Sequence, residues 1–363
     1  MPSASLLTPS SRRSLTIGGF IFILLTVAIF SYQFYRIQAG DELPRLNQLR
    51  WAYLLLILCF LPLETFVLGF RMWIMCRVLQ PEISFWTCFK ADLASSGIAM
   101  LTPSQIGGGP GQIYILNRGG ARLGTALTIS LLAFIGTMMG LLGCGLYFVF
   151  GSDVWHAGSM FVGAVIILVL ISSSMVFFGL CPGLFRAGIA AVSRLIWRMR
   201  GKSFSLKDWW PPDHSRTGSP VDRMDSFSGE LADLVYTYRA DMRQYLQRGK
   251  LNFIAVCLLS LTFLVSRSLL AYFCVRFLGI EGSTLGIILG NQIALLFLTY
   301  LSPTPGNAGI AEGASAWIME NIVPLGFAPY YNLLWRFSTV YIAATAGIIL
   351  LFHGIVVDHC RPK

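Results

Sequence analysis

Charged residues are scarce in this sequence: Asp, Glu, Lys and Arg together make up 12% of its 363 residues. A soluble domain usually carries about 25%. The mean hydropathy is +0.67, and apolar runs of about 20 residues recur, each long enough to cross about 30 Å of hydrocarbon as a helix. The composition excludes a water-soluble enzyme, a secreted disulfide scaffold and a β-barrel, whose strands would alternate over short segments. It predicts an all-α polytopic membrane protein.

Patterns that bind metals or carry out catalysis are also missing. The four histidines are not spaced as ligand pairs and the eight cysteines form no CxxC pair, so zinc, haem and a disulfide framework have no support. We find no Ser/His/Asp grouping, no HExxH and no P-loop lysine, and the glycine-rich run at 107–111 is not a nucleotide fingerprint. We therefore expect no metal, no cofactor and no enzymatic activity.

The chain contains eight apolar runs, of which six are predicted to be full membrane spans and two are different. Two of them, 83–101 and 285–301, end in Pro/Gly-rich stretches. Because membrane backbone cannot leave polar groups facing lipid, such breaks lie inside protein or line a polar cavity. We therefore predict two re-entrant segments and eight helical segments in total, while eight full crossings stay open as an alternative. The six predicted full spans are 15–34, 51–75, 124–150, 159–180, 251–277 and 331–353.

The domain organisation predicted from these runs is a single integral membrane domain over residues 1–363. The first repeat covers about 15–150 and the second about 251–355. Between them, residues 181–250 form a hydrophilic connector with apolar residues at helical spacing, which indicates amphipathic helices at the membrane surface.

The distribution of Lys and Arg predicts the orientation. The connector 181–250 holds 12 of the 27 Lys and Arg residues against 7 acidic residues. The short loops 151–158 and 278–284 contain no Lys or Arg. An excess of Lys and Arg marks the cytoplasmic side. We therefore predict a multi-pass protein of the cell inner membrane with both termini cytoplasmic. The net charge of +10 lies beside the membrane, so nucleic acid is not an expected partner.

An internal repeat joins the two broken segments. Residues 101–112 read LTPSQIGGGPGQ and residues 301–312 read LSPTPGNAGIAE, so that leucine, proline and glycine recur at matching positions. Gly/Pro breaks at corresponding positions in two halves point to a transporter's binding site. Free N–H groups at the start of each following half-helix would attract an anion such as a lipid phosphate. The alternative is a pair of kinks that allow tight helix packing.

Charges within the apolar runs indicate further contacts. Glu64 and Arg267 lie mid-run, where a charge costs about 2.5–3.5 kcal/mol and normally faces a partner or a cavity. Arg267 is predicted to bind phosphate through its planar guanidinium. Glu64 and Glu312 are candidates to pair with Arg267 or to bind a proton or an amine headgroup; a purely structural Glu–Arg pair is the alternative. Arg336 lies near a span end and is expected to extend to the interface.

The two motifs resemble the lysylphosphatidylglycerol synthase transmembrane (flippase-like) domain, over about residues 15–355. In the multiple peptide resistance factor, this domain precedes a soluble aminoacyl-transferase domain and is associated with moving aminoacylated lipid across the inner membrane. The resemblance implies a stand-alone flippase-like protein without the transferase domain. Together with Arg267 and Glu64, the motif match gives these candidate substrate-binding residues: Pro103, Gly107, Gly108, Gln112, Pro303, Gly306, Gly309 and Glu312.

We therefore expect an integral inner-membrane protein that translocates, or assists translocation of, an anionic lipid or lipid-linked intermediate. Two alternatives remain from the sequence. One is a non-transporting membrane partner that organises a lipid or glycan biosynthetic enzyme, with residues 181–250 as its docking surface. The other is a membrane-embedded transferase, although no residues in the sequence indicate such chemistry.

Overall fold

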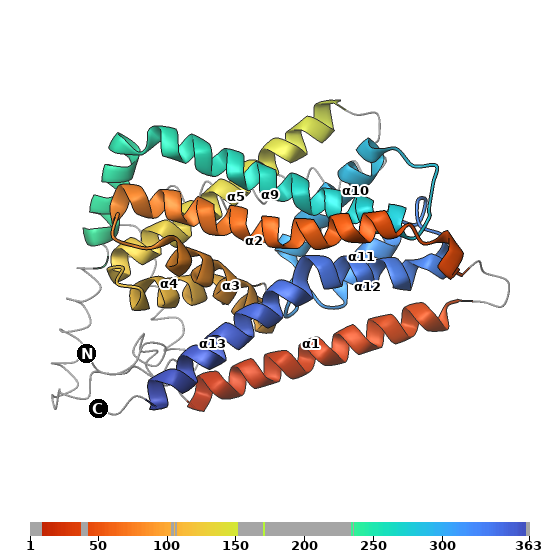
Figure 1. The fold of residues 1–363 in the computed structure, drawn as a ribbon, viewed down its shortest axis with the longest axis horizontal. Coiled ribbons are helices and arrows are strands. Elements are labelled where there is room, and N and C mark those ends of the chain that lie inside the picture. The colour runs from red at the N-terminus through yellow and green to blue at the C-terminus, as the bar shows by residue number, and fades with distance from the viewer. Residues whose placement is uncertain are drawn as a thin grey trace.

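The computed structural model describes residues 9–37, 43–102, 107–151 and 236–360, together with the single residues 105, 170 and 234. Its regular elements are helices (Figure 1). Five of them are long and apolar enough to cross a membrane: Leu15–Tyr35, Trp51–Leu79, Leu123–Gly145, Lys250–Phe277 and Leu325–Leu351. The prediction of an all-α polytopic membrane protein is confirmed. The predicted span 159–180, the loop 151–158 and most of the connector 181–250 lie outside the described residues.

Two long helices, Pro9–Tyr35 and Trp51–Leu79, precede the first interrupted segment, and one, Lys250–Phe277, precedes the second; each interrupted segment is followed by a further span. The predicted repeat boundaries stay a prediction. A helix over residues 236–248 precedes the second repeat. Short 3₁₀ turns, η1 (Leu46–Gln48) and η3 (Leu325–Phe327), and a π-helix, η4 (Phe337–Tyr341), complete the set. The α-helices are α1 (Pro9–Tyr35), α2 (Trp51–Leu79), α3 (Phe85–Leu101), α4 (Gly108–Arg118), α5 (Leu123–Gly151), α9 (Lys250–Phe277), α10 (Leu285–Leu301), α11 (Ile310–Ile318), α12 (Ala328–Arg336) and α13 (Ile342–Cys360).

Each broken segment is a helical hairpin. In the first hairpin, α3 begins beside the end of α4, since a Cβ added at Gly119 would lie 2.2 Å from Cγ2 of Thr87. In the second, Asn291 near the start of α10 donates to the carbonyl of Ile318 at the end of α11 (3.1 Å). Both α3 and α10 have 17 residues, or about 25 Å of helix. Each hairpin therefore reaches deep into the molecule and returns to the end where it began.

The two hairpins enter from opposite ends of the molecule. At one end, the Gln80 side chain joins the α2–α3 turn to the end of α4, donating to the Gly120 carbonyl and accepting from the Arg122 N–H. At the other end, the Arg50 N–H donates to the carbonyl of Phe277, and Arg50 forms an ion pair with Glu281 before α10 begins. Figure 1 places α3 and α4 in the left half and α11 and α12 in the right half. This is the arrangement expected of inverted repeats.

A close helix crossing joins the repeats. A Cβ added at Gly347 of α13 would lie 1.9 Å from the carbonyl oxygen of Leu93 in α3, and one added at Gly97 would lie 2.8 Å from the Ile348 nitrogen. Small residues at such crossings let membrane helices approach closely. In contrast, α1, α2 and α9 carry exposed large apolar side chains on their outer faces, including Phe20, Leu55 and Leu258, which suits contact with acyl chains.

Candidate functional site

A small pocket lies where the tips of the two hairpins meet. It has a volume of about 50 Å³, and the tips contribute Gln105 and Asn307 to its lining. Two arginines from other elements, Arg267 of α9 and Arg336 of α12, also line it. The remaining wall includes aromatic residues and Thr299, Tyr300 and Thr339. Two arginines and two amide residues thus line one pocket.

At both tips, a residue with a side chain adopts a backbone conformation that residues other than glycine rarely take. Gln105 and Asn307 have φ values of 55° and 60°, and such residues cluster at functional sites when the surrounding structure enforces them. At Gly306, φ is 54° and an added Cβ would meet the Phe22 ring at 2.8 Å, so only glycine fits there. The glycine in the second motif therefore allows α1 to pack against the hairpin tip.

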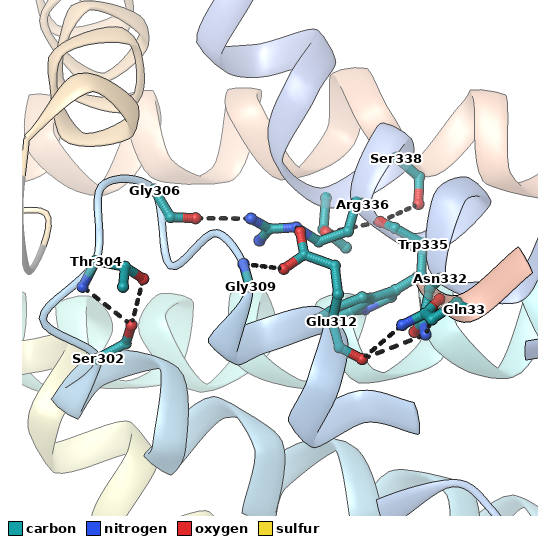
Figure 2. Close-up of polar contacts among 11 residues, drawn as sticks. Gln33, Ser302, Thr304, Gly306, Gly309, Glu312, Asn332, Trp335, Arg336 and Ser338 are labelled. Carbon is teal, nitrogen blue, oxygen red and sulfur yellow. Dashed lines mark hydrogen bonds and ion pairs between the residues drawn. The ribbon is translucent and has the colours of Figure 1, made fainter. Parts of the chain in front are cut away.

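A buried ion pair fixes the second hairpin (Figure 2). Arg336 Nε donates to Glu312 Oε1 at 2.7 Å, and Arg336 Nη2 donates to the Gly306 carbonyl at 2.7 Å. The other carboxylate oxygen of Glu312 accepts from the Gly309 N–H at 2.8 Å. Arg336 is 2% exposed and Glu312 is fully buried. The N-terminus of α11, expected to be open to a ligand anion, is thus capped by a carboxylate of the protein itself.

Two amide side chains extend this network to α1. Gln33 donates to the backbone carbonyl of Glu312 at 3.2 Å. Asn332 of α12 donates to Gln33 Oε1 at 3.3 Å and to the same Glu312 carbonyl at 3.4 Å, as Figure 2 shows. The network therefore holds α1, α11 and α12 together beside the pocket.

Hydrogen bonds between neutral groups hold the tip of the first hairpin and Gln112. Thr102 Oγ1 accepts from the Gly107 N–H at 3.0 Å, and Ser130 of α5 donates to Gln112 Oε1 at 2.9 Å. Gly108 packs closely on α3, where an added Cβ would lie 2.8 Å from the Ser95 hydroxyl. Gln112 thus occupies the position that Glu312 has in the second hairpin, without a charge.

Arg267 contacts the π-helix η4. It donates to the carbonyl of Thr339, and its guanidinium lies 5.3 Å from the centre of the Phe263 ring. The π-helix has an i→i+5 bond from the Ile342 N–H to the Phe337 carbonyl, and such irregular turns often occur at functional sites. Arg267 is partly exposed and lines the pocket.

Arg71 is a third buried arginine, deeper in α2. It donates to Thr137 Oγ1 at 2.6 Å and to Ser260 Oγ at 2.9 Å, which links α2 to α5 and α9. Its Nε has no hydrogen-bond partner within the part of the chain that the structure describes. Asp92 of α3 acts on it electrostatically. Arg71 is 4% exposed, so its side chain lies in the interior of the protein.

Two of the sequence-based expectations about charge are wrong. The hypothesis that Glu312 pairs with Arg267 fails because Glu312 binds Arg336. The expectation that Arg336 extends to the interface fails because its side chain is buried in that pair. Two features indicate this pairing. Arg336 lies well inside the apolar stretch Leu325–Leu351, and a buried carboxylate such as Glu312 is destabilising without a cationic partner.

The candidate substrate-binding residues have different positions in the fold. Arg267 lines the pocket, and Glu64 accepts a hydrogen bond from the neighbouring Ser266 at 3.2 Å. Pro303 is exposed, and Pro103 lies outside the described residues. Substrate binding by these residues stays a prediction. Gln105 and Asn307 were not among the predicted site residues, because their place in the pocket lining depends on how the two tips meet.

Comparison with known proteins gives consistent results over nearly the whole chain. The model of the lysylphosphatidylglycerol synthase TM region matches residues 16–347. The chain is similar to a UPF0104 membrane protein from Archaeoglobus fulgidus, with 24% identity over 347 residues that cover 94% of this chain and 97% of the relative. No solved structure matches it.

Proposed function

Because the chain belongs to the lysylphosphatidylglycerol synthase TM region family, we propose that this multi-pass protein translocates, or assists translocation of, an anionic lipid or lipid-linked intermediate. The observation that carries the proposal is the pocket between the hairpin tips, with Arg267 and Arg336 in its lining. Guanidinium groups bind phosphate oxygens through parallel N–H donors. A pocket with this chemistry within the membrane suits the phosphate of a lipid headgroup.

The size of the pocket favours recognition of the headgroup alone. Its volume of about 50 Å³ has room for a few water molecules, since a cavity needs about 10–15 Å³ on this scale to hold one. Acyl chains do not fit there and would remain among the exposed apolar side chains of α1, α2 and α9. The protein would thus hold the polar part of a lipid while its tails stay in the bilayer.

The opposite entry of the two hairpins supports movement between leaflets. One tip is reached from the end that holds Gln80 and Gly120, and the other from the end that holds Arg50 and Glu281. In transporters built from inverted repeats, rocking of one repeat against the other exposes a fixed midplane site to each side in turn. We propose that the pocket between the hairpin tips likewise opens to each side of the membrane in turn, and that the lipid is not chemically changed.

We propose that the Gln80 end faces the cytoplasm and that the protein lies in the inner membrane. Arg118 and Arg122 lie at this end, and the helix 236–248 adds the exposed Arg239 and Arg243. At the opposite end Arg50 is paired with Glu281, so its charge is offset. Excess basic residues near span ends mark the cytoplasmic side.

A headgroup-accessibility assay tests the proposal. Purified protein in phosphatidylcholine liposomes is given trace phosphatidylglycerol or phosphatidylcholine with a fluorescent label that a membrane-impermeant reductant destroys. In protein-free liposomes about half of the label is protected. We expect the protein to expose the protected phosphatidylglycerol and to act more slowly on phosphatidylcholine, with the lipid unchanged by mass spectrometry. If well-folded protein exposes neither lipid, the proposal fails for these headgroups and a non-transporting role is favoured.

A further inference from the structure

Arg267 interacts electrostatically with two buried carboxylates on different helices. These are Glu64 of α2 and Asp92 of α3, which are 6% and 5% exposed. Within the described part of the chain, neither forms an ion pair with Arg267, whose hydrogen bond goes to the Thr339 carbonyl. Arg267 is therefore a cation shared by two acids, with its guanidinium also in the lining of the pocket.

The two carboxylates do not depend on Arg267 equally. Asp92 also interacts with Arg71, so it keeps a second cation whatever happens at Arg267. Glu64 has Arg267 as its one cationic neighbour among the described residues, together with the hydrogen bond from Ser266. The third buried acid, Glu312, is bound to Arg336 and to the Gly309 N–H. When Arg267 binds another anion, the ionised form of Glu64 therefore loses more electrostatic stabilisation than that of Asp92 or Glu312.

When all its groups are ionised, this interior cluster has as many cations as anions before any ligand binds. Arg71, Arg267 and Arg336 face Glu64, Asp92 and Glu312, and all six lie in or beside membrane-spanning helices. A bound phosphodiester adds one negative charge. An uncompensated charge in a low-dielectric interior is costly, and a buried carboxylate relieves that cost by taking up a proton.

We infer that occupation of the pocket by an anionic headgroup is coupled to uptake of one proton by Glu64. This inference rests on the proposed function and adds a source of free energy to it. In the step, the phosphodiester oxygen replaces the Glu64 carboxylate as the counter-charge of Arg267, and the carboxylate takes a proton from water. No bond in the lipid breaks. Anion and proton then bind together with no net charge, so a pH gradient drives their movement.

Among the described residues, no cation other than Arg267 acts electrostatically on Glu64; the other basic residues on the helices packed against α2 are Lys90 of α3 and Lys250 and Arg276 of α9. Those helices are α3, α5, α9 and η4. From α3 comes Asp92, which acts on Arg267 and Arg71, and the α5 sequence has no charged residue. From η4 comes Tyr341, whose ring lies against Arg336. Tyr300 of α10 acts on Arg267 and Arg71. The coupling is therefore assigned to Glu64 through Arg267.

Calorimetric titration of the purified full-length protein tests this inference. Short-chain phosphatidylglycerol, whose phosphodiester keeps one negative charge throughout, is titrated at several pH values in two buffers of different ionisation enthalpy. The difference in heat counts the protons taken up. Where one proton is taken up, linkage requires the dissociation constant to rise about tenfold per pH unit. Sulfate, also of fixed charge, serves as a parallel titrant that separates a free oxyanion from a lipid headgroup.

Two amide variants assign the proton. Glu64→Gln keeps an acceptor for Ser266, and we expect it to bind the lipid with a pH-independent dissociation constant and no proton uptake. Asp92→Asn is the matched control, because it removes a buried acid near the same arginine; we expect it to retain proton uptake. Melting temperatures in detergent establish that both variants fold. If Glu64→Gln does not fold, the wild-type count still decides whether a proton is taken up, and loss of that uptake in Asp92→Asn overturns the assignment to Glu64.

The outcomes separate the inference from the proposed function. Lipid binding by the wild-type protein without proton uptake overturns the inference and leaves the proposed function standing. Proton uptake that persists in a folded Glu64→Gln protein overturns it as well. If the wild-type protein neither binds nor transports phosphatidylglycerol, both ideas fall for this headgroup. Binding of sulfate, which carries two negative charges, with proton uptake that Glu64→Gln reduces by one supports the inference and shows that a free oxyanion is recognised without the rest of the lipid.

Discussion

The two hairpins have the same backbone plan but are held by different chemistry. In the second, a buried ion pair joins Arg336 to Glu312 and to the tip at Gly306. In the first, Gln112 has the matching position and accepts a hydrogen bond from the Ser130 hydroxyl. A neutral contact thus stands in the first hairpin where the second has a buried ion pair. The charged pair in the second repeat has an additional consequence, since it puts an arginine beside the pocket.

A second matched pair shows the opposite distribution of charge. Asp92 of α3 corresponds by a 200-residue offset to Gln292 of α10, which donates to the Tyr331 hydroxyl at 2.9 Å. The first hairpin therefore has its buried acid on the entering helix, and the second has it on the returning helix. Asp92 interacts with Arg71 and Arg267, and Glu312 with Arg336. The hairpins share a helix–break–helix plan while their charges are arranged asymmetrically around the pocket.

The largest effect expected from this comparison concerns the ends of the molecule. Single cysteines at Glu82, beside the first hairpin, and at Glu281, beside the second, lie in exposed turns. We expect an impermeant thiol reagent added outside intact cells to label the Glu281→Cys protein and not the Glu82→Cys protein, because basic residues gather at the Gln80 end. Labelling of both from one side would contradict opposite entry of the hairpins, and the reverse pattern would invert the orientation.

The second prediction addresses the charged pair. Arg336→Leu leaves Glu312 buried without its cation, and breaking a buried ion pair in this way costs about 3–5 kcal/mol. We expect a large fall in the detergent melting temperature, partly restored by combining Arg336→Leu with Glu312→Leu. Restoration is partial because Glu312 also caps the Gly309 N–H. An unchanged melting temperature of Arg336→Leu would show that the pair does not hold the hairpin.

The third prediction concerns the crossing that joins the repeats. Gly347→Ala places a methyl group 1.9 Å from the Leu93 carbonyl oxygen, so α3 and α13 must separate. Overpacking of this kind costs about 1–3 kcal/mol. Gly143→Ala in α5 is the control, because nothing lies within 4 Å of its added Cβ and alanine favours helix. Equal melting temperatures for the two variants would argue against a tight crossing.

The smallest effect is expected at the neutral counterpart of Glu312. Gln112→Leu leaves the Ser130 hydroxyl without its acceptor, at a cost of about 1–2 kcal/mol. Measured beside Arg336→Leu in the same detergent, it should lower the melting temperature clearly less. A loss as large as that of Arg336→Leu would mean that the neutral and charged hairpins depend equally on their side-chain contacts.

Much of the fold could be predicted because its signals are local. Runs of apolar residues and the Pro/Gly breaks at 101–112 and 301–312 are visible in sequence, and the described helices α3 and α10 end at these breaks. The Lys and Arg distribution likewise depends only on position along the chain.

Partner choice among buried charges could not be predicted in the same way. Glu312 lies 24 residues before Arg336 in the sequence, and helix rotation decides which of several arginines it meets. The pocket is less predictable still, since Gln105 and Asn307 are about 200 residues apart. Both residues have positive φ values in the tips.

The most direct test of the account compares two arginines of α9 in the liposome assay. Arg267 lines the pocket, whereas Arg276, nine residues later, donates to the carbonyls of Ile280 and Ser283 near the helix end. Both also lie over aromatic rings. We predict that Arg267→Gln lowers the rate of phosphatidylglycerol exposure at least about tenfold, a loss of about 1.4 kcal/mol in transition-state stabilisation, while Arg276→Gln stays near the wild-type rate. Equal rates for two folded variants would contradict headgroup binding in the pocket.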